Sequence, residues 1–153
     1  MVRVLLPIAL LFSGFAAGGL MISSLGGAPL LLALPTDRYV PVHQFLVTRF
    51  DPFMPISMTA AFIFDVTLTL TGSPAAFRAL AGLAALLLAG GMAVSLTKNV
   101  PINRWISTLD PERLPDDWER LDPRVRWRNW NVVRTVLAVS ALIVNVSAVA
   151  VVL

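Results

Sequence analysis

Four long stretches of this sequence contain almost no charge. They run over 4–25, 54–71, 79–97 and 132–153, and the charged residues within them are Asp65 and Arg134. Each stretch is close to the ~20 residues that a helix needs to cross a hydrocarbon core. A backbone in lipid must satisfy its own hydrogen bonds, which favours helices. The sequence therefore predicts one all-α domain over 1–153, folded as an integral membrane antiparallel four-helix bundle.

The first stretch also resembles a signal peptide, because Arg3 precedes it and small residues lie near Phe15. We interpret it as the first membrane span. Gly14 and Gly18 form a GxxxG pair within it, a pattern that lets membrane helices approach closely. We expect this pair to pack within the bundle, with homo-oligomer formation as the alternative.

The composition excludes several classes of function. The chain is 57% hydrophobic and 14% charged, whereas a soluble domain is nearer half apolar and a quarter charged. It contains no cysteine, which excludes disulfides, thiolate metal sites and cysteine nucleophiles. A single histidine leaves little material for a metal centre. The net charge is +3, but no long basic run or recognition motif indicates a nucleic-acid partner.

Lysine and arginine are distributed unevenly along the chain. Ten of the twelve lie in the polar segments 35–53 and 98–129 or just beside them, and the other two are Arg3 and Arg78. The positive-inside rule then places both polar segments in the cytoplasm and both termini outside. The expected location is a bacterial inner membrane.

The first polar segment contains the only histidine. A short helix is expected over 42–50, with His43, Val47 and Phe50 on one face, and Asp51-Pro52 should end it. The unperturbed pKa of histidine is near neutrality, so His43 is a candidate general base. The alternative is an interfacial histidine that caps a loop.

Asp65 lies about eleven residues into the second stretch. An ionisable side chain at that depth is costly unless it is neutral, paired or facing a wet cavity, so it is a candidate for a functional role. We expect Arg134 or Asn145 as its partner if the fourth span packs alongside. The alternative is a structural hydrogen bond, for example to Thr67.

The second polar segment begins and ends with amides and aromatic residues. Asn99 and Asn103 flank Pro101, where we expect the third span to turn back over the mouth of the bundle. Trp127, Trp130 and Arg134 have the i, i+3, i+7 spacing of one helix face. They could form an aromatic wall with a cation behind it, suited to a flat, oxygenated ligand. A tryptophan belt at the lipid headgroups would also explain them.

Several motifs resemble those of a known family. They are "YVPVHQ" at 39–44, "RFDPFMP" at 49–55, "TKNVPIN" at 97–103 and "WRNWNVVR" at 127–134. With the glycine-rich first stretch, they make essentially the whole chain resemble the anthrone oxygenase-like family of small four-helix membrane proteins, long catalogued as a domain of unknown function. Members with an assigned role resemble enzymes that oxidise anthrones to anthraquinones in aromatic polyketide pathways, without flavin or metal. The resemblance implies the fold more strongly than the reaction.

The implied reaction is compatible with the residues. A base that removes the acidic benzylic C–H of an anthrone makes an electron-rich enolate, which can itself reduce O₂, so no cofactor is required. We expect His43 to be the base, and Asn99, Asn103, Asn131 or Arg134 to donate hydrogen bonds to the enolate oxygen. Trp127 and Trp130 would stack on the rings. The residues expected to orient or bind the substrate are Gln44, Arg49, Asp51 and Asp65.

Two other readings use the same pocket. A membrane cyclase or isomerase would need the base and donors without O₂. A non-enzymatic subunit would bind a lipid or partner through the tryptophan- and arginine-rich mouth. All three readings predict a lipophilic small molecule or membrane lipid as the ligand.

Overall fold

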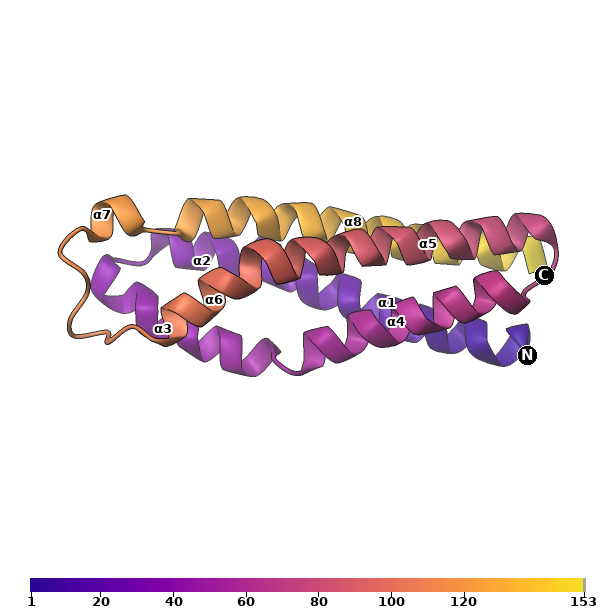
Figure 1. Ribbon diagram of the computed structural model, residues 1–153, viewed down its shortest axis with the longest axis horizontal. Helices are drawn as coiled ribbons and strands as arrows, with labels where there is room; N and C mark the ends of the chain where they lie inside the picture. The colour runs from indigo at the N-terminus through magenta and orange to yellow at the C-terminus, as the bar shows by residue number, and fades with distance from the viewer. Residues whose placement is uncertain (153) are drawn as a thin grey trace.

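Four long helices form the body of the molecule in the computed structural model, which describes residues 1–152. Leu153, the last residue of the predicted fourth span, lies outside the described residues. The four helices are α1 (Val2–Ile22), α4 (Phe53–Thr71), α5 (Ala75–Val94) and α8 (Arg124–Val152). Helices α1 and α5 each pack against both α4 and α8, and the two termini lie at the same end of the bundle (Figure 1). The predicted all-α antiparallel four-helix bundle is confirmed.

The four helices have the length and composition of membrane spans. The apolar helical segments run over Val2–Ala33, Phe53–Thr71, Ala75–Ser107 and Trp118–Val152. Small residues face the bundle interior: Ala9, Ala61 and Ala141 are fully buried. Large apolar side chains such as Leu70 and Leu86 are more than 70% exposed. This arrangement suits a lipid solvent, because small residues let helices approach closely and lipid tails cover the large ones.

The expected packing of Gly14 and Gly18 is not observed. A Cβ placed on either glycine would meet no atom of the protein within 4 Å, so both face away from the neighbouring helices. The close approaches occur instead at two other glycines. A Cβ on Gly19 of α1 would lie 2.5 Å from the Met54 sulfur on α4, and a Cβ on Gly91 of α5 would lie 3.1 Å from the Met58 side chain, also on α4. Helix α4 therefore packs against a glycine on each of its neighbours α1 and α5.

Two of the spans continue through a π-helical turn. Helix α1 passes through η1 (Ser23–Gly27) into α2 (Ala28–Ala33), and α5 passes through η2 (Ser95–Asn99) into α6 (Val100–Ser107). Each π turn ends two residues before a proline, Pro29 or Pro101. A proline has no N–H and its ring collides with the carbonyl four residues earlier, and a π turn relieves that collision by widening the helix. The turn expected at Pro101 therefore does not form, and the helix runs on to Ser107.

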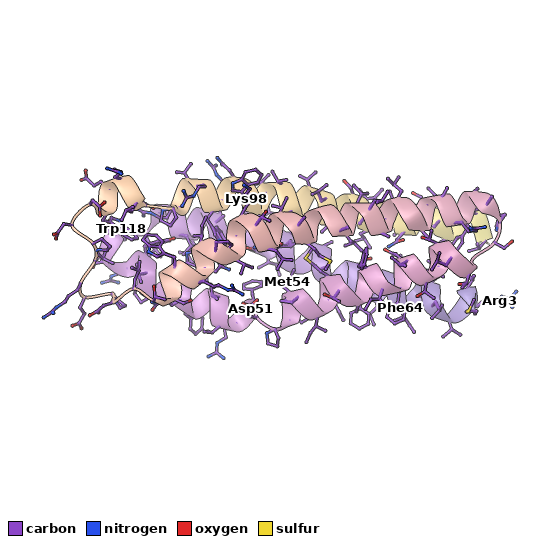
Figure 2. The ribbon with its side chains drawn as sticks, viewed as in Figure 1. Arg3, Asp51, Met54, Phe64, Lys98 and Trp118 are labelled. Carbon is purple, nitrogen blue, oxygen red and sulfur yellow. The ribbon has the colours of Figure 1, made fainter. Side chains whose placement is uncertain are left out.

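The polar segments gather at the end of the molecule away from the termini. Helix α3 (Thr36–Phe50) and the short α7 (Trp118–Leu121) lie there, while Arg3 lies at the opposite end (Figures 1 and 2). The predicted helix over 42–50 is present and begins six residues earlier, at Thr36. It ends at Phe50, before Asp51-Pro52, as expected. The break between α3 and α4 places Asp51 near the middle of the molecule (Figure 2).

Candidate functional site

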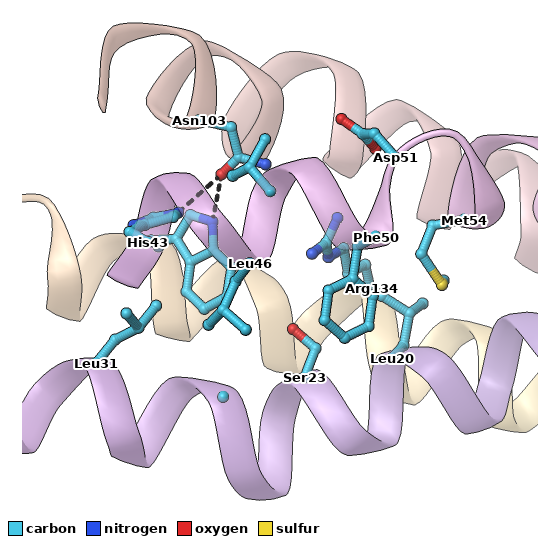
Figure 3. A pocket seen from close by; sticks show the side chains of 13 residues that line it. Leu20, Ser23, Leu31, His43, Leu46, Phe50, Asp51, Met54, Asn103 and Arg134 are labelled. Carbon is cyan, nitrogen blue, oxygen red and sulfur yellow. Dashed lines mark hydrogen bonds between the residues drawn. The ribbon is translucent and has the colours of Figure 1, made fainter. Parts of the chain in front are cut away.

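A small cavity lies where α3 crosses the end of the bundle. We call it the inner cavity; its volume is about 50 Å³. Its walls come from α1, η1, α2, α3, α6 and α8, together with Asp51 and Met54 where α4 begins (Figure 3). The lining residues are Leu20, Ser23, Gly27, Leu31, His43, Leu46, Val47, Phe50, Asp51, Met54, Asn103, Trp127 and Arg134. His43 and Arg134 thus line one cavity, in agreement with the prediction that both polar segments lie at the same end of the bundle.

A chain of hydrogen bonds fixes the state of His43. Trp127 Nε1–H donates to Asn103 Oδ1 at 2.8 Å, and His43 Nε2 lies 3.2 Å from the same oxygen. An indole N–H can only donate, so the shared atom is the amide oxygen and His43 must also donate to it. The neutral imidazole therefore carries its proton on Nε2. Its Nδ1 then accepts from the Tyr39 hydroxyl at 2.8 Å.

Burial reinforces this assignment. Tyr39 and His43 are 0% and 1% exposed. Burial lowers the pKa of His43 to about 4, and the hydrogen bond that His43 donates to Asn103 opposes this shift only in part, so the ring is neutral at pH 7. Burial also raises the pKa of Tyr39 well above its usual range, which keeps the hydroxyl protonated as a donor. Both cavity-facing N–H groups, on His43 and Trp127, point at Asn103 (Figure 3).

Arg134 provides the positive charge of the site. Its Nε and Nη2 donate to Asn131 Oδ1 at 3.0 and 2.7 Å, and its Nη1 lies 3.4 Å from Ser95 Oγ. Asn131 is held in turn by both serines of η1: Ser23 Oγ donates to its Oδ1 at 3.3 Å, and its Nδ2 donates to Ser24 Oγ at 2.7 Å. The guanidinium is therefore oriented entirely by neutral groups.

Arg134 makes no direct ion pair. Within residues 1–152, the ion pair at 4.0 Å or less joins Arg124 to Asp122. Asp51 lines the inner cavity with Arg134 and attracts its charge from a distance greater than that of an ion pair. A guanidinium without a direct carboxylate partner in a mostly apolar setting favours an anionic or electron-rich ligand.

A second space adjoins the inner cavity. We call it the outer cleft; its volume is about 230 Å³, and it lies between the start of α4 and the α5–η2–α6 segment. Four residues line both spaces: Asp51, Met54, Asn103 and Arg134. The remaining wall of the outer cleft is formed by Pro55, Met58, Thr59, Met92, Ser95, Leu96 and Val100. The outer cleft borders an open groove that Asp51, Pro55, Leu96, Val100 and Asn103 also line.

The structure brings together five of the predicted site residues: His43, Asp51, Asn103, Trp127 and Arg134 line the inner cavity. Asn131 and Asn99 lie behind them. Asn131 orients Arg134, and the fully buried Asn99 donates from Nδ2 to the Trp127 carbonyl at 3.1 Å. Asn99 therefore supports the helix that carries Trp127 and lines neither space.

Three other predicted residues lie outside both spaces. Gln44 Nε2 donates to the carbonyls of Ile106 and Leu109 at 2.9 and 3.0 Å, which anchors α3 to the end of α6. Arg49 is exposed and lies over the Phe45 ring. Trp130 faces Lys98, whose Nζ is 5.2 Å from the ring. The expectation that Trp127 and Trp130 form one wall is not met, because Trp127 lines the inner cavity and Trp130 lies against Lys98 of η2, outside both spaces.

Asp65 lies apart from the cavity, deep in the bundle. It is 0% exposed and accepts a hydrogen bond on Oδ2 from Asn145 Nδ2 at 3.0 Å. Asn145 also donates to Ser13 Oγ at 3.1 Å, so the cluster ties α1, α4 and α8 together. The expected partner Asn145 is confirmed, whereas Arg134 bonds to Asn131 and Ser95 instead. Asp65 lines neither the inner cavity nor the outer cleft.

Sequence reasoning passed over Ser23, Ser95 and the role of Tyr39. Both serines are the first residues of the π turns, and each stands six residues before a proline. That shared spacing was a usable signal. Tyr39 stands four residues before His43, the separation at which side chains on one helix face meet. In residues 1–152, no three His, Cys, Asp or Glu side chains group closely enough to hold a metal ion.

One comparison with known proteins gives a match. The model of the family described as anthrone oxygenase matches residues 45–144. This range covers the end of α3, the whole of α4 to α7 and most of α8. No curated protein and no solved structure matches the chain.

Proposed function

Since this chain belongs to the anthrone oxygenase family, we propose that it is a membrane-embedded oxygenase that oxidises a lipophilic aromatic substrate of the anthrone type with O₂. We place the site at the cytoplasmic face of a bacterial inner membrane, because most arginines lie at that end of the bundle. The reaction in this proposal needs no flavin or metal, since the deprotonated substrate is itself the reductant.

One observation carries the proposal most directly. Arg134 faces both the inner cavity and the outer cleft, makes no ion pair within 4.0 Å in residues 1–152 and is oriented by Asn131. A fixed cation of this kind stabilises the oxyanion that forms when an anthrone loses its benzylic proton. Asn103 lines the same walls. The rings of the substrate would occupy the outer cleft, against its methionines, which adapt well to flat apolar ligands.

The hydrogen-bond pattern changes the expected base. His43 directs an N–H toward Asn103, and the lone pair on its Nδ1 is taken by Tyr39, so the neutral ring has no free acceptor facing the substrate. Asp51 lines both spaces and is exposed at their mouth. We therefore assign the base to Asp51 in place of His43. His43 then acts by holding the oxygen of Asn103 in position.

The proposed reaction balances. Asp51 accepts the benzylic proton, and the enolate that remains carries its negative charge next to Arg134. The enolate passes one electron to O₂, and the resulting radical and superoxide combine at the benzylic carbon. The peroxide then breaks its O–O bond as the second benzylic proton leaves. One oxygen atom stays as the new ketone and the other leaves as water, so the four-electron oxidation of CH₂ to C=O matches the four-electron reduction of O₂.

Oxygen consumption by the purified protein in detergent, with anthrone as the probe, tests the proposal. We expect one O₂ consumed per anthraquinone formed. Asp51→Asn should lower kcat on the order of 10²-fold or more, the usual contribution of a general base. Arg134→Gln should lower kcat/KM by a similar factor. Asp37→Asn provides the matched control. Asp37 is exposed in the first turn of α3, the helix that ends just before Asp51, and it lines neither space.

The competing readings give different results in the same assay. Conversion of an aromatic polyketide-type probe without oxygen consumption would indicate a cyclase or isomerase. Binding of anthrone without any conversion would indicate a non-enzymatic binding subunit. Full activity in Asp51→Asn with loss of activity in His43→Gln would return the base to His43.

A further inference from the structure

We propose that the inner cavity is a binding site for molecular oxygen, separate from the outer cleft that takes the aromatic substrate. This inference rests on the proposed oxygenase function and adds where its second substrate binds. Two substrates that react with each other need adjoining compartments, and the structure contains two spaces of unequal size that share a wall.

The size of the inner cavity suits a diatomic molecule. Its volume is about 50 Å³. A single water needs roughly 10–15 Å³, and a dry cavity of about 150 Å³ holds benzene. The inner cavity is thus too small for even one aromatic ring and large enough for O₂. The outer cleft, at about 230 Å³, exceeds the space that one ring requires and opens further into the groove.

The inner end of the cavity favours an apolar guest over water. A buried water is held by two to four polar partners. Here the donors of His43 and Trp127 are committed to Asn103, and that of Ser23 to Asn131. The polar groups that remain belong to Arg134, Asp51 and the amide NH2 of Asn103, all on the wall shared with the outer cleft. Five buried side-chain atoms among residues 1–152 lack a partner, on Asp65, Asn99, Trp118, Arg128 and Asn145, and none of these residues lines the cavity.

The rest of the inner end is apolar. Leu20, Leu31, Leu46 and Phe50 supply most of it (Figure 3), and Gly27 contributes no side chain on the η1 side. O₂ is apolar and gains contact with such side chains without losing hydrogen bonds to water. The hydrogen bonds around Asn103 therefore serve a second purpose: they occupy the His43 and Trp127 donors that would otherwise bind water at this end.

The wall shared by the two spaces brings the bound substrate next to the bound O₂. Arg134 and Asp51 line both spaces, so a carbon bound in the outer cleft beside them adjoins the inner cavity. When the enolate gives one electron to O₂, the negative charge moves from the substrate oxygen to superoxide. Arg134 remains beside the charge before and after this transfer, which lowers the cost of the step.

Steady-state kinetics with two matched variants test the division of the site. Leu46 lines only the inner cavity, and Thr59 lines only the outer cleft. Leu46→Phe should raise the KM for O₂ several-fold and leave the KM for anthrone unchanged, and Thr59→Phe should do the reverse. Gly27→Ala gives a milder version of the first variant, because a Cβ there meets only Ser23 Oγ, at 4.0 Å. If Leu46→Phe or Gly27→Ala raises the KM for anthrone and not that for O₂, the proposal is wrong.

Xenon binding provides a readout that does not depend on activity. Crystals of the protein exposed to xenon should show one xenon atom in the inner cavity, and Leu46→Phe should remove it while Thr59→Phe should not. Ordered water in place of xenon would overturn the proposal. If the protein binds xenon but consumes no O₂ with any aromatic probe, the cavity takes an apolar gas while the oxygenase function, and with it the assignment to O₂, fails.

Discussion

A single oxygen atom, Asn103 Oδ1, organises the polar end of the site at the scale of individual residues. It receives hydrogen bonds from Trp127 on α8 and His43 on α3 while Asn103 itself belongs to α6. Because this oxygen can only accept, it sets the protonation state of His43. Tyr39 completes the chain from the other side of the ring. Three helices that approach one another at the cavity are thereby joined through one atom.

The first prediction concerns the pH dependence of stability. The pKa of His43 is about 4 in the folded protein, below the ordinary value of 6.5. Between pH 4 and pH 6.5 the unfolded chain therefore binds a proton at His43 that the folded protein does not bind. The contribution of neutral His43 to the free energy of unfolding is fully present above pH 6.5 and is lost as the pH falls toward 4. At 1.36 kcal/mol per unit, the loss is on the order of 3 kcal/mol.

Thermal melting of the detergent-solubilised protein from pH 7.5 to 4 measures this effect. Glutamine can donate to Asn103 and accept from Tyr39 but does not titrate, so His43→Gln is the matched variant. Other acids also titrate toward pH 4, and the difference between wild type and variant isolates the contribution of His43. Parallel melting curves for the two proteins across this range would contradict the assignment.

The second prediction concerns the buried pair Asp65 and Asn145. Asp65→Ala removes the acceptor of the Asn145 amide and should cost roughly 1–3 kcal/mol. Asp65→Asn keeps an acceptor and adds a donor, in a cluster where Asp65 Oδ1 and Asn145 Oδ1 both lack a donor. The asparagine variant should therefore be at least as stable as wild type. Thermal melting of both variants checks this, and equal destabilisation by Ala and Asn would show that the carboxyl group itself is required.

The sequence predicted these residue pairs only in part. Asp65 needed a polar partner because lipid supplies none, and Asn145 and Arg134 were the two partners expected on the fourth span. Choosing between Asn145 and Arg134 required the depth of each along α8, which the apolar pattern does not encode. The role of Asn103 was likewise hidden, because its partners are 60 and 24 residues away in the chain.

Two π turns shape the site at the scale of secondary structure. Each has serine at its first position, and the two serines contact the same pair on α8: Ser23 bonds to Asn131, and Arg134 reaches Ser95. Widened turns of this kind are frequent at functional sites. The two prolines thus impose, on opposite sides of α8, the backbone geometry that orients the guanidinium.

The third prediction separates this role from simple stability. Deleting the exposed Thr97, which lines neither the inner cavity nor the outer cleft, should restore regular α-helical spacing in η2, bring the Pro101 ring against a carbonyl and cost about 3 kcal/mol. Adding Pro101→Ala to the deletion should recover the stability. Activity should remain low in the double variant, because Ser95 no longer faces Arg134.

Melting temperature and kcat, measured side by side on the single and double variants, distinguish a role of the π turn in activity from a role in stability alone. The variant with Pro101→Ala alone is the control, since it retains the length of the segment. If the double variant recovers both stability and turnover, the π turn serves only to accommodate the proline.

The apolar runs predicted the existence of the four spans but not their continuation. Length and charge identify a membrane helix, so 54–71 agrees with α4 to within one residue. The first run continues as helix past Pro29 to Ala33. The third run continues to Ser107, past Pro101, where we expected it to end. In this structure a proline two residues after a π turn leaves the helix intact. The hydropathy of the sequence cannot distinguish such a turn from a break.

At the scale of the whole molecule, charge and architecture agree on one orientation. The termini and Arg3 lie at one end, while α3, α7 and the start of α8 carry most of the arginines at the other (Figures 1 and 2). Both spaces of the site lie where α3 and α6 meet the bundle. The site would then exchange protons with the cytoplasm through Asp51 and receive lipophilic substrate from the bilayer.

The fourth prediction tests this orientation in intact cells. The chain has no cysteine, so single cysteines can be introduced without background labelling. Glu112→Cys lies in the exposed loop between α6 and α7, and Ser73→Cys lies in the exposed loop between α4 and α5 at the other end. A membrane-impermeant maleimide should label the cysteine at 73 in intact spheroplasts and the cysteine at 112 only after lysis, because the positive-inside rule predicts that the arginine-rich end lies in the cytoplasm. The reverse pattern would place Asp51 and Arg134 at the outer face, and the proton released by the proposed reaction would then leave to the periplasm.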